Sequence, residues 1–359
     1  WEHKTVPQES VFTTLGEKAE VVLVRDGELE TSFRVTLNWA LPEGRTGDDR
    51  ARSAHRIPYV ITNTVTLRRG QPWVEIITEL ENNAEDHYLQ VCFPTGVQAD
   101  EVAVQGQFDV VKRPVAPPDY GRYDELPMTE HPMNSFVDIS DGAEGMALLN
   151  EGLKAYTAED DAARTLCLTL LRCFPLRICV TQEMLDYSHL DKGTQCLGRH
   201  AFRYAVMPHR GDWAQGGVWQ AAERFNLAFH AAQVGPTKHG TEPLAKSFLE
   251  LRPESLHVSA VKRSENGGGW IVRLFNPFET AVRGALRLNG GYAGPTAIQS
   301  PVERVRAEFA LPQSEGAKWR EVRMVTLEEI PERTLGMDDE GWVEFEISPK
   351  KIMTFEFLR

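Results

Sequence analysis

The chain has 359 residues, 42% of them hydrophobic, and its 52 acidic and 39 basic residues give a formal net charge of −13. This length predicts two domains, because single cores stop growing near about 250–300 residues. The negative charge argues against binding to nucleic acid or to an anionic membrane surface, and no apolar run reaches the roughly 20 residues that cross a bilayer.

The first two thirds of the chain predict long antiparallel strands. In residues 32–39 apolar side chains alternate with polar ones, which is the period of a strand with one solvated face. Residues 59–67 and 73–80 flank a turn that contains Gly70 and Pro72, and this arrangement predicts a hairpin. Further extended stretches follow at residues 88–93, 107–113, 145–150, 165–172 and 201–207.

One helix is predicted after these strands, within residues 212–229. Asp212 is its expected N-cap, and Gln215 is the expected partner in a capping box. Spacings of three and four residues put one apolar stripe on its surface. The stripe consists of Val218, Ala222, Phe225 and Phe229.

A linker is predicted at residues 233–247, which are rich in Gly, Pro, Thr and Lys and have no hydrophobic period. Beyond it, a series of short strands separated by turn residues predicts a small β-sandwich. In residues 341–347 apolar side chains alternate with glutamates, so one face of that strand is expected to be buried. We therefore place one domain at residues 1–240 and a second at residues 241–359.

The stretch YAVMPHRGDW, at the junction of the last long strand and the helix, combines a histidine with an aspartate. A catalytic histidine needs a partner that fixes its tautomer and a substrate proton within reach. Pro208 and Gly211 indicate a turn instead. We therefore interpret His209, Asp212 and Trp213 as a structural corner, in which Asp212 caps the helix and the other two side chains pack.

Two other pairs have spacings that suit chemistry. His189 and Asp191 have the H-x-D spacing of metal ligands, but no third ligand is locally placed, so we expect solvated loop residues and no metal site in this chain. Asp138 and Asp141 offer the paired carboxylates of a glycosidase. The sequence SDG around Asp141 also predicts an ordinary turn, which we favour.

Residues 112–123 predict a loop that is stiffened by prolines. Its cations and aromatic rings are Arg113, Arg122, Tyr120 and Tyr123. Aromatic rings offer flat faces to sugars, so the loop is a candidate to reach into a neighbouring cleft, and a plain surface excursion is the alternative. His131 and Asn134, in the segment that follows, are placed to touch a ligand from outside.

No complete catalytic set is visible, since the phosphate-binding, dinucleotide-binding, serine-hydrolase and zinc-protease motifs are all absent. The odd number of cysteines, without a C-x-x-C pair, argues against a disulfide framework and predicts reduced thiols in a cytoplasmic protein. They are Cys92, Cys167, Cys173, Cys179 and Cys196. The chain starts with Trp1 and shows no targeting segment, so we expect a fragment of a longer protein.

Several segments, taken in order, resemble the C-terminal half of glycoside hydrolase family 38, the α-mannosidases, in their bacterial and cytosolic branch. They are FDVVKRP, HPMNSFVDISDG, GMALLNEGLKAY, LTLLR, QCLGRHAFRYAVMPHRGDW and RFN. The last long segment, residues 195–213, is the most specific. The resemblance covers roughly residues 1–230 by motif and the remainder by the order of its strands.

The resemblance implies an all-β fold, with a large antiparallel super-sandwich of the galactose-mutarotase type followed by a small immunoglobulin-like sandwich. Complete members of the family precede these with a β/α barrel and a helical bundle, which supply the zinc ligands and the nucleophile. We therefore expect zinc in the absent catalytic domain and transfer no catalytic or metal-binding role to His189 or Asp191. Arg113, His131 and Asn134 match the loop that is expected to form the rim of the sugar site.

The resulting hypothesis is the non-catalytic C-terminal portion of an α-mannosidase, which in its intact form performs retaining, zinc-assisted hydrolysis of α-mannosides. Its expected partners are its own catalytic barrel and helical domain and an α-mannoside carbohydrate, and the oligomeric state stays open. A free-standing carbohydrate-binding module is the alternative. A surface that packs on a barrel should also leave an exposed apolar patch on the isolated chain.

Overall fold

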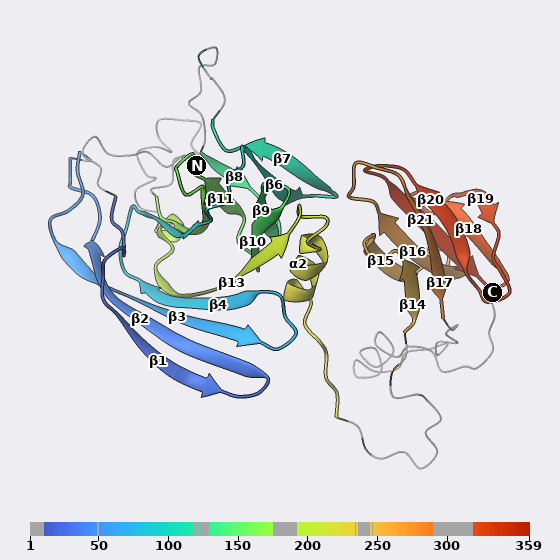
Figure 1. Ribbon diagram of the computed structural model, residues 1–359, viewed down its shortest axis with the longest axis horizontal. Coiled ribbons are helices and arrows are strands. Elements are labelled where there is room, and N and C mark those ends of the chain that lie inside the picture. The colour runs from blue at the N-terminus through green and yellow to red at the C-terminus, as the bar shows by residue number, and fades with distance from the viewer. Residues whose placement is uncertain are drawn as a thin grey trace. The chain divides into compact units, whose positions relative to one another are not determined.

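A computed structural model describes residues 11–48, 50–117, 121, 129–174, 192–233, 235, 245, 247–289 and 319–359. Contacts divide the chain into two compact units, residues 1–229 and 230–359. Figure 1 shows that strands dominate the described part of both units. This division falls eleven residues before the boundary of 240 and 241 expected from the composition of the linker.

The first unit contains a large antiparallel sheet with nine strands (Figure 1). In spatial order they are β1 (Ala19–Asp26), β2 (Glu30–Pro42), β3 (Arg56–Arg68), β4 (Val74–Asn82), β13 (Gly198–Arg210), β10 (Glu144–Asn150), β9 (Phe136–Ser140), β6 (Glu101–Gly106) and β7 (Asp109–Pro114). The predicted hairpin is confirmed, because β3 pairs with β4 in antiparallel register. Gly70 in its turn has a φ of 82°, a conformation that glycine adopts without steric cost.

A smaller sheet packs against the large one. It contains β5 (Tyr88–Pro94), β12 (Thr165–Arg172), β11 (Ala155–Ala158) and β8 (Glu130–Pro132). One apolar cluster includes Tyr59 and Leu148 from the large sheet together with Tyr156 and Leu168 from the small sheet. Side chains from the two inner faces thus share one core, so the first unit is the predicted large sandwich.

The core-side face of the large sheet continues into exposed apolar side chains on β1, β2 and β3. Phe33 lies on the same face of β2 as Leu37, because side chains alternate between the two faces of a strand, and Leu37 packs on the core. Leu23 is directly opposite Phe33 on the edge strand β1. The exposed fractions are 60% for Val21, 50% for Leu23, 41% for Phe33 and 55% for Leu67. These four residues are called the β1–β3 apolar face below.

The helix α2 (Val218–Asn226) packs on the opposite face of the large sheet, over β9 and β10. Val218, Ala222 and Phe225 are buried as the stripe predicted, but Phe229 lies beyond the end of the helix and is fully exposed. None of the helices in the described part of the chain has the length and apolarity that crossing a membrane requires.

The start of α2 also differs from the prediction. Gly217, not Asp212, occupies the N-cap position, and its φ of 66° is left-handed. The residues between Asp212 and Gly217 form turns, so the helix begins later than the capping pattern suggested. The two glycines before Val218 explain the delay, because glycine weakens the first turns of a helix.

The second unit is a small β-sandwich of two sheets. One contains β14 (Leu249–Arg252), β17 (Val282–Leu288) and β20 (Val343–Ile347), and the other contains β15 (His257–Arg263), β16 (Gly269–Phe275), β21 (Ile352–Leu358), β18 (Glu321–Val325) and β19 (Pro331–Leu335). The alternation predicted for residues 341–347 is confirmed, since β20 buries every second side chain. Phe345 of one sheet packs on Phe355 of the other, with ring centroids 5.2 Å apart.

Candidate functional site

Arg113, a predicted rim residue, connects the two sheets of the first unit. It lies near the end of β7, and its Nη1 donates a hydrogen bond of 2.9 Å to the carbonyl oxygen of Pro132 in β8. The same nitrogen lies 3.5 Å from the hydroxyl oxygen of Tyr156 in β11. The guanidinium therefore ties the last strand of the large sheet to the edge of the small one.

His131, the second predicted rim residue, joins the same group. Its ring centroid lies 5.9 Å from that of Tyr156, which it faces across the β8–β11 pair. Burial lowers the pKa of His131, and the nearby cation of Arg113 lowers it further. The imidazole is therefore neutral at pH 7 and can both donate and accept one hydrogen bond.

Asn134, the third, is held through its backbone. Its N–H donates to the carbonyl oxygen of Gln105 at 2.9 Å, and its own carbonyl accepts from the side-chain amide of Asn150 at 3.0 Å. These bonds fix the short segment between β8 and β9. The structure thus brings Arg113 and His131 together on Tyr156, while Asn134 follows on a fixed backbone. Such a group offers hydrogen-bond donors to a ligand and no matched acid and base.

The strand-to-helix corner contains a buried acid–base pair. His209 in β13 and Asp138 in β9 lie 2.6 Å apart between Nε2 and Oδ1, and their side chains are 3% and 1% exposed. The strand between them, β10, contributes Gly145, where a Cβ would lie 2.5 Å from Cε1 of the histidine. Gly216 covers the other side of the ring just as closely. The imidazole therefore fits a slot that two glycines leave open.

The electrostatics of this pair follow from its burial. Burial alone would lower the pKa of His209, but the hydrogen bond to Asp138 and the charge of that carboxylate raise it. Burial raises the pKa of Asp138 against the effect of the histidine. The second carboxylate oxygen of Asp138 is buried and has no hydrogen-bond partner. Since almost none of either side chain is exposed, the pair links β9 to β13 within the sheet.

The remaining corner residues form the turn. The carboxylate of Asp212 accepts hydrogen bonds from the backbone N–H groups of Ala214 and Gln215 at 3.0 and 2.9 Å. The backbone N–H of Asp212 in turn donates to the side-chain oxygen of Gln215 at 3.3 Å. Trp213 packs on Phe136 with centroids 6.4 Å apart. The reciprocal capping pattern is therefore present, but it closes the turn before α2.

Asp141 also makes a turn. Its carboxylate accepts from the N–H groups of Ala143 and Glu144 at 2.8 and 3.0 Å, and these bonds lower its pKa. Asp138, three residues earlier, bonds to His209 instead. The two carboxylates therefore serve separate structural contacts.

The predicted metal-ligand pair, His189 and Asp191, lies outside the described residues, as do Arg122, Tyr120 and Tyr123. Within the part of the chain that the structure describes, no three His, Cys, Asp or Glu side chains converge in a way that could hold a metal ion. The described donor set therefore does not fit a zinc site of the usual four ligands.

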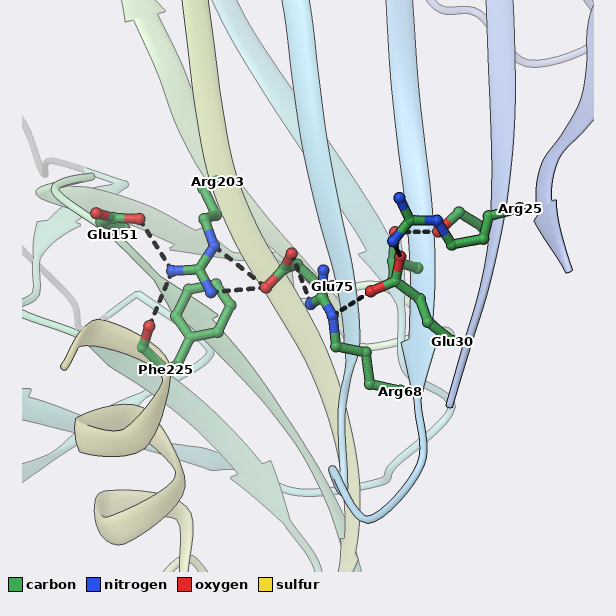
Figure 2. Close-up of polar contacts among 9 residues, drawn as sticks. Arg25, Glu30, Arg68, Glu75, Glu151, Arg203 and Phe225 are labelled. Carbon is green, nitrogen blue, oxygen red and sulfur yellow. Dashed lines mark hydrogen bonds and ion pairs between the residues drawn. The ribbon is translucent and has the colours of Figure 1, made fainter. Parts of the chain in front are cut away.

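Sequence reasoning missed a line of charged side chains across the solvent-facing side of the large sheet (Figure 2). The ion pairs are Arg25–Glu30 at 2.7 Å, Arg68–Glu30 at 2.6 Å, Arg68–Glu75 at 2.9 Å, Arg203–Glu75 at 2.6 Å and Arg203–Glu151 at 3.0 Å. We call this set the ion ladder. Its end reaches α2, because Arg203 donates to the carbonyl of Phe225 and lies 3.9 Å above the ring centroid of that residue.

A second missed network lies on the small sheet. Glu130 accepts hydrogen bonds of 2.6 Å from the hydroxyls of Tyr88 and Thr169, and its other oxygen pairs with Arg172 at 3.2 Å. Burial raises the pKa of Tyr88, and the carboxylate reinforces this. Alternating polar residues in β5 and β12 were the available signal, but the pairing of these strands was not predictable from them.

Comparison with known proteins identifies the relatives of the chain. The family model described as the glycosyl hydrolases family 38 C-terminal domain matches residues 1–174, and the family 38 C-terminal β-sandwich domain matches residues 255–355. A Halalkalibacterium halodurans protein named as a mannosylglycerate hydrolase is 26% identical over 234 residues. That match covers 63% of this chain and 24% of the relative. Human α-mannosidase 2C1 is 28% identical over 206 residues, 57% of this chain and 18% of the relative.

The fold of the chain is also similar to that of a solved protein. A solved α-mannosidase from Enterococcus faecalis superposes with a TM-score of 0.73 and 21% identity, covering 96% of this chain and 36% of that one. The chain thus spans about a quarter or less of the curated relatives and about a third of the solved one. The two family models, found in order along one chain, show that it belongs to glycoside hydrolase family 38 and forms the C-terminal β region of a member of that family.

Proposed function

We propose that this chain is the non-catalytic C-terminal portion of an α-mannosidase of the cytoplasm, and that it supports the catalytic barrel and the rim of the sugar site. The observation that carries the proposal is the match of two C-terminal family models, in order, over residues 1–174 and 255–355. Several relatives with this region are named α-mannosidases. Retaining hydrolysis of α-mannosides would be carried out by the barrel and not by this chain.

The β1–β3 apolar face supports this division of labour. Val21, Leu23, Phe33 and Leu67 are each more than 40% exposed, although they continue a face that is buried elsewhere in the same sheet. Contiguous exposed apolar surface on a soluble protein usually marks an interface. We assign it to the remainder of a family 38 enzyme, because the relatives extend far beyond the region that this chain matches.

The rim role rests on Arg113 and His131. Both reach Tyr156 from the boundary of the two sheets, and the bond from Arg113 to Pro132 positions its cation. A neutral histidine and a fixed guanidinium suit the recognition of sugar hydroxyls without chemistry. Zinc would activate the reaction in the barrel, and the described side chains of this chain supply no ligand set for it.

An activity assay tests the division directly. The chain alone, incubated with an aryl α-mannoside and added zinc, should release no product above the buffer rate. Turnover by the chain alone would overturn the proposal. Titration with mannose and short manno-oligosaccharides distinguishes this proposal from its alternative. Saturable binding by the isolated chain would favour a free-standing carbohydrate-binding module.

The rim role has its own test in an enzyme that contains both this chain and its barrel. Arg113→Ala should raise KM about tenfold, which corresponds to about 1.4 kcal/mol, with a smaller change in kcat. Arg199→Ala is the matched control, because Arg199 is an exposed arginine on β13 outside this cluster. Equal effects of the two substitutions would remove Arg113 from the rim.

A further inference from the structure

Cys92 and Cys167 face each other across the edge of the small sheet. They are directly opposite partners in the antiparallel pair of β5 and β12. Opposed residues in such a pair have Cα atoms about 4.5 or 5.5 Å apart and side chains on the same face. Both spacings lie within the roughly 4.4–6.8 Å that disulfides span. The strand register therefore places two free thiols at a separation that a disulfide can bridge.

The two thiols differ in their access to solvent. Cys92 is exposed on β5, which is an edge strand, whereas Cys167 on β12 is 2% exposed. A hydrogen bond from the Cys167 thiol lowers the pKa of Cys92, while burial and the carboxylate of Glu159 oppose this shift. The same bond, together with burial, raises the pKa of Cys167. Cys92 is therefore the accessible nucleophile, and Cys167 is a sheltered second thiol.

We propose that Cys92 and Cys167 form a thiol–disulfide exchange site, at which a low-molecular-weight disulfide such as oxidised glutathione converts the pair into a disulfide between β5 and β12. The site is independent of the proposed mannosidase function, because it depends only on the register and exposure of two strands. It also adds a covalent link at a sheet edge that is otherwise held by hydrogen bonds, among them the one between the hydroxyls of Tyr88 on β5 and Thr169 on β12.

The exchange needs no other reactant. The Cys92 thiolate attacks one sulfur of oxidised glutathione, forms a mixed disulfide and displaces the first glutathione thiolate. Cys167 then gives its proton to solvent and attacks the sulfur of Cys92, which displaces the second glutathione thiolate. The two protein thiols lose two electrons, and one glutathione disulfide is reduced to two glutathione thiols.

The chain contains a matched control pair. Cys173 and Cys196 also interact through their thiols, but Cys173 is fully buried and does not lie in a strand register with Cys196. Burial raises the pKa of Cys173 to about 12. Both pairs therefore bring two thiols close together, but only Cys92 combines exposure to solvent with a lowered thiol pKa.

The experiment uses the whole chain with the substitution Cys179→Ser. This removes the cysteine that lies outside the described residues, so that every remaining thiol has a known position. The reduced protein is incubated with oxidised glutathione at pH 7, alkylated and mapped by mass spectrometry. A peptide pair linked through Cys92 and Cys167 should form about tenfold faster than any product at Cys173. Cys167→Ala should stop the reaction at a glutathione adduct on Cys92, and Cys92→Ala should leave Cys167 unmodified.

A second measurement separates exchange chemistry from a structural effect. The pH midpoint for alkylation of Cys92 by iodoacetamide should move upward in Cys167→Ala, because the hydrogen bond that stabilises the thiolate is lost. Circular dichroism checks that each variant keeps its strand content. Faster oxidation at Cys173, a disulfide between two chains, or an unlinked Cys92 adduct that persists in the parent protein would each overturn the proposal.

Discussion

Two buried carboxylates on the same face of the large sheet differ in the partners that hold them. Glu75 on β4, with 5% of its side chain exposed, bonds to two arginines, Arg68 and Arg203, through its two oxygens. Asp138 on β9, with 1% exposed, bonds to one histidine through a single oxygen and leaves the other unpaired. The first carboxylate is fixed by permanent cations, and the second by a partner that can lose its charge.

This difference separates two kinds of stability. Arginine stays protonated at all ordinary pH values, so the ion ladder loses no cation as the pH rises through neutrality. Histidine titrates near neutrality, so the contact between β9 and β13 depends on protons. The same sheet therefore contains one link whose charges do not change near neutral pH and one whose charges do.

The largest effect is expected when the ion ladder loses its centre. Glu75→Ala removes the buried carboxylate that Arg68 and Arg203 share, so that each partly buried cation keeps only its outer carboxylate partner, Glu30 for Arg68 and Glu151 for Arg203. We expect the first unit to lose about 3 kcal/mol of unfolding free energy, because breaking a buried pair costs more than forming it gains. Urea denaturation followed by tryptophan fluorescence measures this loss.

Glu79→Ala is the matched control for that experiment. Glu79 lies four residues further along β4 on the same side of the strand, but its side chain is exposed. Its loss should change the unfolding free energy by about 0.5 kcal/mol or less. Similar losses in the two variants would show that the ladder contributes nothing beyond ordinary surface charge.

Packing around the histidine gives the next largest effect. Gly145→Ala places a Cβ 2.5 Å from Cε1 of His209 and 2.8 Å from the Cβ of Ser140, so the ring must leave its position near Asp138. We expect a cost of about 2 kcal/mol, which is in the range for overpacking a buried site. Gly47→Ala is the control, because a Cβ there meets nothing within 4 Å and the substitution should be close to neutral. Gly142→Ser would not serve, because Gly142 has a φ of 90°.

These contacts also show how far the sequence could be interpreted. Period-two alternation predicted the β3–β4 hairpin and β20 correctly, because alternation is a local property that burial on one face imposes directly. The partner of His209 was not local, since Asp138 is 71 residues away and lies across β10. Spacing in the sequence grouped His209 with Asp212 and Asp138 with Asp141. Strand register instead brings His209 and Asp138 together.

The ion ladder was hidden for the same reason. Glu75 and Arg203 are 128 residues apart, and their contact depends on β13 pairing with β4 and not with its neighbours in sequence. The contact of Arg113 and His131 at Tyr156 was partly predictable, because both residues lie in segments that resemble the family, but their role at a sugar site stays a prediction. Nothing in the sequence identified Tyr156 itself, whose alternating position on β11 was indistinguishable from an ordinary core residue.

A smaller effect is expected from pH, and its sign is fixed by two raised pKa values. The folded state raises the pKa of His209 above its usual 6.5, so the folded chain keeps a proton that the unfolded chain has released. The stabilisation is complete below pH 6.5 and is lost as pH rises through the folded value. Asp138 has the same sign, because its pKa is also raised, and the carboxylate of Asp212 raises both.

We therefore expect the urea concentration at the unfolding midpoint of the first unit to decrease as the pH is raised from 6 to 9. In His209→Gln this part of the pH dependence should disappear, while the second unit keeps its own profile in both proteins. A midpoint that rises with pH in the parent chain, or an unchanged slope in His209→Gln, would show that the pair does not retain its proton on folding.

The smallest effect on stability, and the most informative one about function, concerns the β1–β3 apolar face. Phe33→Ser and Leu23→Ser replace exposed side chains, so the unfolding free energy should change by about 0.5 kcal/mol or less. Self-association of the isolated chain should nevertheless decrease, as measured by sedimentation velocity, because the apolar surface that drives it is reduced. In an enzyme that also contains the barrel, the same substitutions should weaken the contact between the two parts and lower its thermal midpoint. If association and midpoint both stay unchanged, this face is ordinary surface and is not the proposed interface.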